Sequence, residues 1–339
     1  MVRIEDVAAR AGVSTATVSR ALRGLPNVSP ATRAQVARAA AELDYVASRS
    51  AASLASGRTL SVAVVTPYVD RWYFAQVVGA LEEGLHPAGY DVLLHTLLGS
   101  AREPFDPLRL RRRVDAVVVV TVPLTGAQLD VLRGLALPVV FVGAAVPGAA
   151  SVRVDDVAIG RTATEHLVAL GHTRVAHVGG DPAQPVNFHS PADRRAGWMS
   201  ALRDAGLQPR REYDVDGDFT PRGGAAALRA LLDLPEPPTA VFAASDEMAL
   251  GVVIEAGQRG VQVPEELSVI GVDDHPLAEV QGLTTVAQDV AGQGREAARL
   301  VLEALRGAAG HPSEHVLVPV RLLARGSTCA PGSAEPRAS

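Results

Sequence analysis

The pattern of apolar and polar positions changes near residue 60. Beyond that boundary, short Val-rich apolar runs alternate with amphipathic stretches of helical period, and such runs are typical of strands buried on both faces of a parallel sheet. The predicted strands are 60–65, 92–95, 116–121, 139–142, 175–179, 240–243 and 269–272. The predicted helices are 74–86, 158–170, 194–205, 221–232 and 246–259. This alternation predicts doubly wound α/β sheets, and about 280 residues favour two lobes over one sheet.

Before this boundary the apolar positions follow a helical period instead. Ile4 and Val7 share one helix face, and Gly12 ends that helix with a turn. Ser14 is an N-cap candidate for a second helix over residues 15–22. Two short helices joined by a glycine-containing turn predict a helix-turn-helix.

The second helix divides into a core face and a polar face. Val18, Ala21 and Leu22 fall at core spacing, which leaves an outward face made of Thr15, Ala16, Ser19 and Arg20. Because the side chains near its N-terminus are short, the helix can lie close to base edges, and Arg20 can reach a guanine. The alternative is a small helical bundle whose polar face is only solvated.

A third helix is predicted from Pro30, with Ser29 as its N-cap. Polar side chains gather at its start, namely Asn27, Ser29, Thr32 and Arg33. Backbone amides and hydroxyls at a helix N-terminus can hold a DNA phosphate. Double-stranded DNA is therefore the predicted partner of this end of the chain.

The charge distribution agrees with a nucleic-acid partner at the N-terminal end only. All 32 basic residues are Arg, and residues 1–58 hold eight of them against four acidic residues. The remaining residues hold 24 basic and 33 acidic side chains, so a basic head precedes an acidic body.

Several function classes are excluded by what the sequence lacks. Cys329 is the single cysteine and the histidines show no ligand spacing, so we expect no disulfide framework, no metal and no cofactor. No glycine-rich phosphate loop follows the first strand, which argues against a nucleotide-dependent enzyme. Acidic residues near the N-terminus and the absence of a long apolar run predict a cytoplasmic protein without a membrane segment.

Motifs at fixed spacing carry a family resemblance. The N-terminal motifs are Val7-Ala8, Gly12-Val13-Ser14, Thr17-Val18-Ser19-Arg20, residues 28–33, Leu43-Asp44-Tyr45 and Leu54. The later motifs are Glu165-His166-Leu167, Leu170-Gly171-His172, residues 195–198, Ser245-Asp246, Ala249-Leu250-Gly251, residues 270–274, residues 283–286 and residues 325–328. Together they resemble the LacI/GalR (lac/purine repressor) family of transcription regulators.

The resemblance implies roles in DNA binding. Thr15, Ala16 and Arg20 would read the operator half-site in the major groove, with Ser19, Asn27, Ser29 and Thr32 beside them. Leu54 would wedge into a central minor-groove step together with its twin from a second subunit. The hinge helix that carries it is too short to be stable alone, so it can act as a switch.

The resemblance also implies the architecture. The all-α helix-turn-helix headpiece would cover residues 1–47, the hinge 48–58, the sensing and dimerisation domain 59–330, and a flexible tail 331–339. The sensing domain would have the type I periplasmic-binding-protein fold of two doubly wound lobes, crossed near residues 156–160, 284–289 and 312–318. The N-lobe would then hold about 59–156 and 289–314, and the C-lobe about 157–286 and 315–328.

Ligands of open α/β sheets bind beyond the carboxyl ends of the strands. Residues 67–74 follow the first predicted strand and are rich in aromatic side chains, of which Trp72 and Tyr73 are expected in the cleft. Asp273 and Arg194 match the family's aspartate–arginine pair, expected across the cleft, where it would hold adjacent sugar hydroxyls. For Asp273 the alternative is capping of a following helix. Further matching positions are Asp155, Ser190, Phe219, Ser245 and Gln288.

These observations predict a homodimeric, sequence-specific repressor that a small sugar or related polyol releases from a palindromic operator. A corepressor-dependent repressor that senses a purine or another metabolite is the alternative, and a sugar-binding protein without a DNA role is a further one. The C-terminal segment contains no leucine heptads, so the tetramerisation segment of the lac repressor is not expected.

Overall fold

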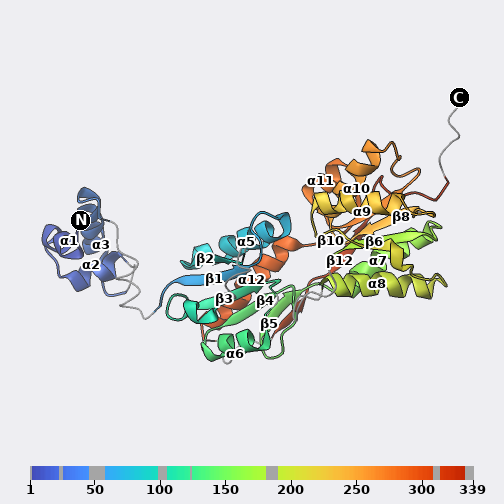
Figure 1. The fold of residues 1–339 in the computed structure, drawn as a ribbon. Coiled ribbons are helices and arrows are strands. Elements are labelled where there is room, and N and C mark those ends of the chain that lie inside the picture. Colours follow the sequence, from blue (N-terminus) through green and yellow to red (C-terminus); the bar gives the residue numbers. More distant parts are fainter. Residues whose placement is uncertain are drawn as a thin grey trace. The chain divides into compact units, whose positions relative to one another are not determined.

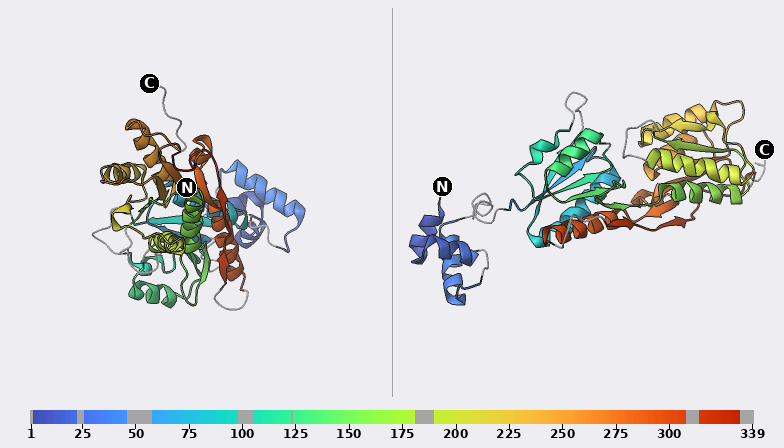
Figure 2. Two further views of the ribbon diagram at one scale, coloured as in Figure 1. Left: turned by 90° about the vertical axis from the view of Figure 1, so that its right-hand side faces the viewer. Right: turned by 90° about the horizontal axis from the view of Figure 1, so that it is seen from below.

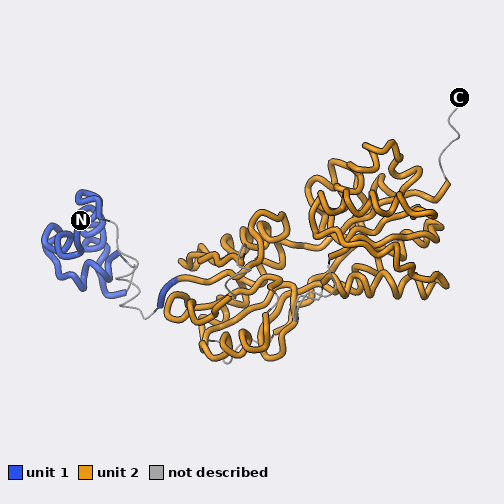
Figure 3. Tube along the Cα trace, viewed as in Figure 1, with its two compact units in different colours: residues 1–60 blue, residues 61–339 orange. Residues whose placement is uncertain are grey.

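The computed structural model describes residues 2–22, 26–45, 58–97, 105–122, 124–180, 190–307 and 314–332. The chain forms two compact units, residues 1–60 and 61–339, each described here by itself (Figure 3). The predicted hinge helix, with Leu54, and most of the predicted tail lie outside the described residues. Among the described residues, no helix has the length and apolar character needed to cross a bilayer.

The first unit contains three helices, α1 (Ile4–Ala11), α2 (Thr15–Leu22) and α3 (Pro30–Glu42). Each contributes one fully buried valine to a shared core: Val7, Val18 and Val36. The turn between α1 and α2 requires a left-handed residue, and Gly12 supplies it with φ of 62°. The predicted helix-turn-helix and third helix are confirmed.

The N-lobe of the second unit is a parallel six-stranded sheet in the order β11-β5-β4-β3-β1-β2. Its strands are β1 (Ser61–Thr66), β2 (Asp91–Thr96), β3 (Ala116–Val120), β4 (Val139–Val142), β5 (Ala150–Arg153) and β11 (His315–Leu317). Helices α5 (Trp72–Leu85) and α12 (Val290–Leu305) pack together on one face, and α6 (Gly126–Gly134) covers the other (Figure 1). Two short 3-10 helices, η1 (His86–Ala88) and η2 (Pro107–Leu110), belong to this lobe.

The C-lobe repeats this plan with the order β12-β10-β9-β8-β6-β7, in which only β12 runs antiparallel to its neighbour. Its strands are β6 (Val175–Gly179), β7 (Asp214–Asp216), β8 (Ala240–Ala243), β9 (Ser268–Asp273), β10 (Thr284–Gln288) and β12 (Val320–Leu323). Its helices are α7 (Asp156–Ala169), α8 (Ser190–Asp204), α9 (Pro221–Leu232), α10 (Asp246–Gln258) and α11 (Pro276–Val280), with a 3-10 turn, η3 (Arg211–Tyr213), before β7. The predicted two-lobe α/β fold class is confirmed.

The chain passes between the lobes three times: from β5 to α7, from β10 to α12 and from β11 to β12. The two later crossings run beside each other, because β12 pairs with β10 (Figure 2). The N-lobe extends three residues beyond the end predicted at about 314, to Leu317. Strand β11 belongs to the N-lobe sheet, since His315 pairs with Ser151 in parallel register and the two side chains hydrogen-bond at 2.7 Å.

Candidate functional site

Helix α2 presents the predicted DNA-reading residues to solvent. Thr15, Ala16 and Arg20 are exposed and Ser19 is half-buried, while Val18 on the opposite side is fully buried. The helix begins at Ser14, whose hydroxyl accepts a hydrogen bond from the Thr17 amide at 3.2 Å. This cap fixes the first turn, where the short side chains stand.

The start of α3 holds the second group of predicted DNA contacts. Asn27 is exposed and adopts the left-handed conformation with φ of 68°. The Ser29 hydroxyl accepts from the Thr32 amide at 3.1 Å and pairs with the Thr32 hydroxyl at 2.8 Å. Both hydroxyls therefore stabilise the helix start, and their contact with phosphate stays a prediction.

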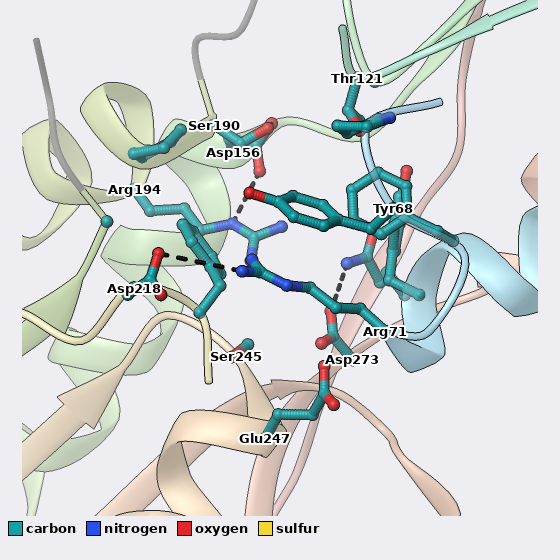
Figure 4. Close-up of a pocket in the computed structure, with 18 of the residues that line it drawn as sticks. Tyr68, Arg71, Thr121, Asp156, Ser190, Arg194, Asp218, Ser245, Glu247 and Asp273 are labelled. Carbon is teal, nitrogen blue, oxygen red and sulfur yellow. Dashed lines mark hydrogen bonds and ion pairs between the residues drawn. The ribbon is translucent and has the colours of Figure 1, made fainter. Parts of the chain in front are cut away.

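The second unit contains a cavity of about 480 Å³ at the carboxyl ends of strands from both sheets. This is the position at which open α/β sheets bind ligands. Seven residues predicted from the sequence line it: Tyr73, Ser190, Arg194, Phe219, Ser245, Asp273 and Gln288. Figure 4 labels Ser190, Arg194, Ser245 and Asp273 among them.

Two predicted cleft residues lie elsewhere. Trp72 packs its ring against the ring of His275, with centroids 4.9 Å apart, and is not among the residues that line the cavity. Asp155 caps α7 by accepting the Ala158 amide at 2.9 Å. Because Asp155 is the N-cap, it is the next residue, Asp156, on the first helical turn, that lines the cavity.

Arg194 and Asp156 form a buried ion pair in the cavity wall. The Arg194 Nε donates to Asp156 Oδ1 at 2.8 Å, and its Nη1 donates to the carbonyl oxygen of Ala244 at 2.5 Å. The Ser190 hydroxyl donates to the other carboxylate oxygen of Asp156 at 2.9 Å. Both charges are satisfied by hydrogen bonds, as burial requires.

Close packing of α7 and α8 places this pair. A Cβ at Gly160 would lie 2.1 Å from the carbonyl oxygen of Arg194, and one at Gly197 would lie 2.3 Å from that of Val157. Only glycine permits this approach. Arg194 on α8 and Asp273 at the end of β9 both belong to the C-lobe, so the expected pairing of these two residues across the cleft is wrong.

A chain of four hydrogen-bonded side chains crosses the cleft from the N-lobe to Asp273. The Tyr73 hydroxyl donates to Gln293 Oε1 at 3.2 Å, and Gln293 Nε2 donates to Gln288 Oε1 at 2.9 Å. Gln288 Nε2 then donates to Asp273 Oδ1 at 2.6 Å. We refer to Tyr73, Gln293, Gln288 and Asp273 as the cleft relay. Every donor in it points toward the carboxylate, which favours the ionised form of Asp273.

Asp273 does not cap the following helix. His275 occupies the N-cap of α11, and its Nδ1 accepts the Leu277 amide at 3.0 Å. Asp273 has a φ of 122° and the next residue, Asp274, has a φ of 63°, so two consecutive non-glycine residues occupy conformations that L-residues rarely adopt. Strain of this kind persists where the surrounding structure holds it and clusters at ligand sites.

Burial raises the pKa of Asp273 to about 6, although Arg194 and the hydrogen bond from Gln288 oppose the shift. Burial also raises the pKa of its neighbour Asp246, which accepts hydrogen bonds from the His275 amide and the Thr285 hydroxyl. A raised carboxyl pKa means that the folded state binds the proton more tightly than the unfolded chain. The stability that Asp273 contributes in the empty protein therefore increases as the pH falls from 7 toward 4.

We predict that ligand affinity falls as the pH drops below 6. Ligand hydroxyls would donate to the ionised Asp273, so binding at low pH must first remove a proton, and affinity decreases about tenfold between pH 7 and pH 5. Calorimetric titration across this range checks the prediction. The Asp273→Asn variant should show a flat profile, and a pH-independent affinity in the unaltered protein would contradict it.

Several cavity residues were not predicted as ligand contacts: Tyr68, Thr121, Asp156, Asp218, Glu247 and Gln293. Arg71, which belongs to the segment 67–74 expected at the cleft, also lines the cavity. Its guanidinium carbon lies 3.7 Å from the centroid of the Tyr68 ring, and its Nη2 lies 3.9 Å from Asp218 Oδ1 (Figure 4). Arg71 comes from the N-lobe and Asp218 from the C-lobe, so this ion pair spans the cleft. Five of the six unpredicted residues lie within four residues after the end of a strand, all but Gln293. This position after a strand was the sequence feature that could have identified them as ligand contacts.

Thr121 follows β3 and has an unpaired polar atom. Its side chain is buried, and its hydroxyl oxygen has no hydrogen-bond partner within the part of the chain that the structure describes. An unpaired buried hydroxyl is costly. Thr121 lines the cavity, so this unpaired atom lies in the cavity wall.

Comparison with known proteins decides the family. Residues 3–48 match the model of bacterial regulatory proteins of the lacI family, and residues 164–328 match a periplasmic binding protein-like domain. The repressor CytR of Escherichia coli K12 is 34% identical over 337 residues, which cover 96% of each chain. The chain belongs to the lacI family. It is a DNA-binding transcription regulator, as the sequence predicted, and members of this family are regulators rather than enzymes.

Solved structures of lacI-family proteins share the whole fold. A complex of the regulator CelR with cellobiose is 32% identical, with a TM-score of 0.71, and covers 96% of this chain and 100% of its own. The lac repressor dimer bound to operator and the anti-inducer ONPF is 28% identical, with a TM-score of 0.82, and covers 97% and 99%. The curated regulator CelR of Thermobifida fusca is 34% identical over 93% of this chain and 95% of its own.

Proposed function

We propose that this lacI-family protein is a cytoplasmic, homodimeric repressor that leaves a palindromic operator when a small neutral sugar or related polyol binds in the cavity. The observation that carries the proposal is the composition of the cavity. At the carboxyl ends of two sheets, the cavity combines two arginines, the carboxylates that form ion pairs with them, further carboxylates without an arginine partner in these pairs, and aromatic rings. The relative CelR, whose solved structure is a complex with cellobiose, supports the same ligand class.

Hydrogen-bonding groups in the cavity suit vicinal hydroxyls. The free lone pairs of Asp273 can accept from hydroxyls, and Arg71 and Arg194 can donate to them. Tyr68 and Phe219, which line the cavity, provide apolar surface for the C–H face of a sugar ring. A ligand that touches Arg71 of the N-lobe and Asp273 of the C-lobe together would stabilise one arrangement of the lobes, which is how it would alter DNA affinity.

The charge of the cavity predicts rejection of phosphorylated ligands. Two arginines face five carboxylates: Asp156, Asp216, Asp218, Glu247 and Asp273. We expect the phosphate ester of any active sugar to bind at least about a hundredfold more weakly than the neutral sugar, because a dianion would meet an excess of negative charge at short range. Competition titration with the neutral sugar and its phosphate ester measures the difference in affinity, and comparable affinity for the two compounds would contradict the prediction.

Selection of genomic DNA fragments by the purified full-length protein tests the proposed function. Without added ligand and near physiological salt, one palindrome of about 14–20 base pairs should be recovered. Neutral sugars, polyols and nucleosides are then tested for release of this duplex. Selection only in the presence of a purine or another metabolite would favour the corepressor alternative, and failure to select any sequence would refute the proposal.

A further inference from the structure

The acidic sensing domain carries one loop dense in arginine. Where η2 ends and the chain turns toward β3, four of five residues are Arg109, Arg111, Arg112 and Arg113, and all four are exposed. We call residues 109–113 the arginine loop. Its one apolar member, Leu110, and the following Val114 are each only 2% exposed, so the loop is anchored to the N-lobe core while its charged side chains face solvent. Arg112 adopts the left-handed conformation with φ of 61°.

The arginine loop lies at the amino edge of the N-lobe sheet. The Asp115 amide, two residues beyond the loop, donates to the carbonyl oxygen of Ser61 at 2.8 Å, and Ser61 is the first residue of β1. The cavity lies at the opposite, carboxyl edge, beyond Thr121. About 17–20 Å of strand separates the two edges, and none of the four arginines is among the residues that line the cavity.

Positive charge is concentrated in the arginine loop. Arg58, exposed three residues before β1, adds a fifth arginine at this edge, where the acidic residues include Glu82 and Glu83 at the end of α5, Asp91 and Asp115. Besides burial, Arg109 and Arg113 lower the pKa of His95 on the neighbouring strand β2, so the positive field of the arginine loop extends over the face of the sheet. A basic region on a domain with 33 acidic and 24 basic side chains has the character of a polyanion site.

The polypeptide also joins this edge to the helix-turn-helix. Residues 46–57 connect Tyr45, the last described residue after α3, to Arg58. Twelve residues span at most about 40 Å. When the first unit is bound to its operator, DNA next to the half-site is therefore held at high effective concentration near the arginine loop.

We propose that the arginine loop binds the phosphate backbone of the DNA that flanks each operator half-site. This inference rests on the proposed DNA-binding function and adds a second, sequence-independent contact from the sensing domain. Arginine donors match phosphate oxygens, and such contacts give affinity and salt dependence without base specificity.

The test compares two triple variants of the full-length protein. R111Q/R112Q/R113Q removes three charges from the loop, and R203Q/R211Q/R222Q removes three exposed charges from the C-lobe as a matched control. Operator affinity is measured from about 50 to 200 mM salt, on a duplex that ends at the operator and on one with flanks of about 15 base pairs. Thermal midpoint and ligand affinity confirm that both variants are folded.

On the long duplex, the loop variant should reduce the slope of log affinity against log salt by about two, as expected when each subunit neutralises one phosphate fewer. Its affinity at the lower salt concentration should fall roughly tenfold, whereas the control should match the unaltered protein. If operator affinity decreased equally for the loop variant and the control, the total charge of the protein would explain the effect. If the loop variant lost affinity equally on both duplexes, the flanking DNA would play no part and the substitutions would act through the protein structure. Either result, or an unchanged slope, overturns the inference, whereas absence of operator binding by the unaltered protein would instead refute the proposed function.

Discussion

The Asp273→Asn variant is expected to stay on the operator at ligand concentrations that release the unaltered protein. The substitution removes the anionic acceptor toward which the cleft relay points, while Asn tolerates positive φ better than most residues. Hydrogen bonds to a charged group contribute about 1.5–3 kcal/mol each, so removing two of them from the ligand lowers affinity by roughly 150-fold to 25,000-fold. Calorimetry measures ligand affinity, and anisotropy of a labelled operator measures release.

Asp274→Asn is the matched control for this experiment. Asp274 also has positive φ, but its carboxylate pairs with Arg325 at 2.6 Å and is not among the cavity-lining residues. We expect nearly unaltered ligand affinity together with some loss of thermal stability. If the Asp273 variant were released at the same ligand concentration as the unaltered protein, Asp273 would not be a ligand contact.

The Arg20→Ala variant should lose specific operator binding and keep its ligand affinity. Arg20 is exposed on α2, on the side away from the buried Val18 that packs the helix in the core. One side-chain contact with a base contributes about 1–3 kcal/mol, and a dimer makes it twice, so operator affinity falls roughly 30-fold to 25,000-fold. Anisotropy on operator and scrambled duplexes measures the difference.

Arg38→Ala tests whether charge alone explains such a decrease. Arg38 is exposed on α3 of the same unit, so its removal lowers the charge of the DNA-binding unit by the same amount. Its effect should be small and similar on both duplexes. Equal decreases for Arg20→Ala on operator and scrambled DNA would show that Arg20 contacts phosphate rather than bases.

Local patterns determined the central elements of the fold. Strands β4, β6 and β8 and helix α9 begin and end at the predicted residues, because their apolar runs or stripes are continuous and bounded by polar or turn residues. Caps acted locally too, as at Ser29. The order of family motifs was equally a property of sequence alone, and it identified the DNA-binding unit.

Tertiary structure decided three edge strands. Strands β7, β11 and β12 have three or four residues, and all of their positions are exposed or half-buried, so no continuous apolar run predicts them. Helix α12 was not predicted either. Its contact with α5 depends on a close approach that only the folded chain shows, since a Cβ at Gly294 would lie 2.6 Å from the carbonyl oxygen of Val77.

The cavity shows the same division. Sequence identified the strand ends at which ligand contacts gather, and seven of the predicted residues are there. It did not distinguish Asp155 from Asp156, because the choice depends on where α7 begins and which carboxylate meets Arg194. It also gave no sign of the cleft relay, whose Tyr73 and Gln293 are 220 positions apart. Contacts between such distant segments arise only when the chain crosses between lobes and packs α12 beside α5, and no local pattern encodes that geometry.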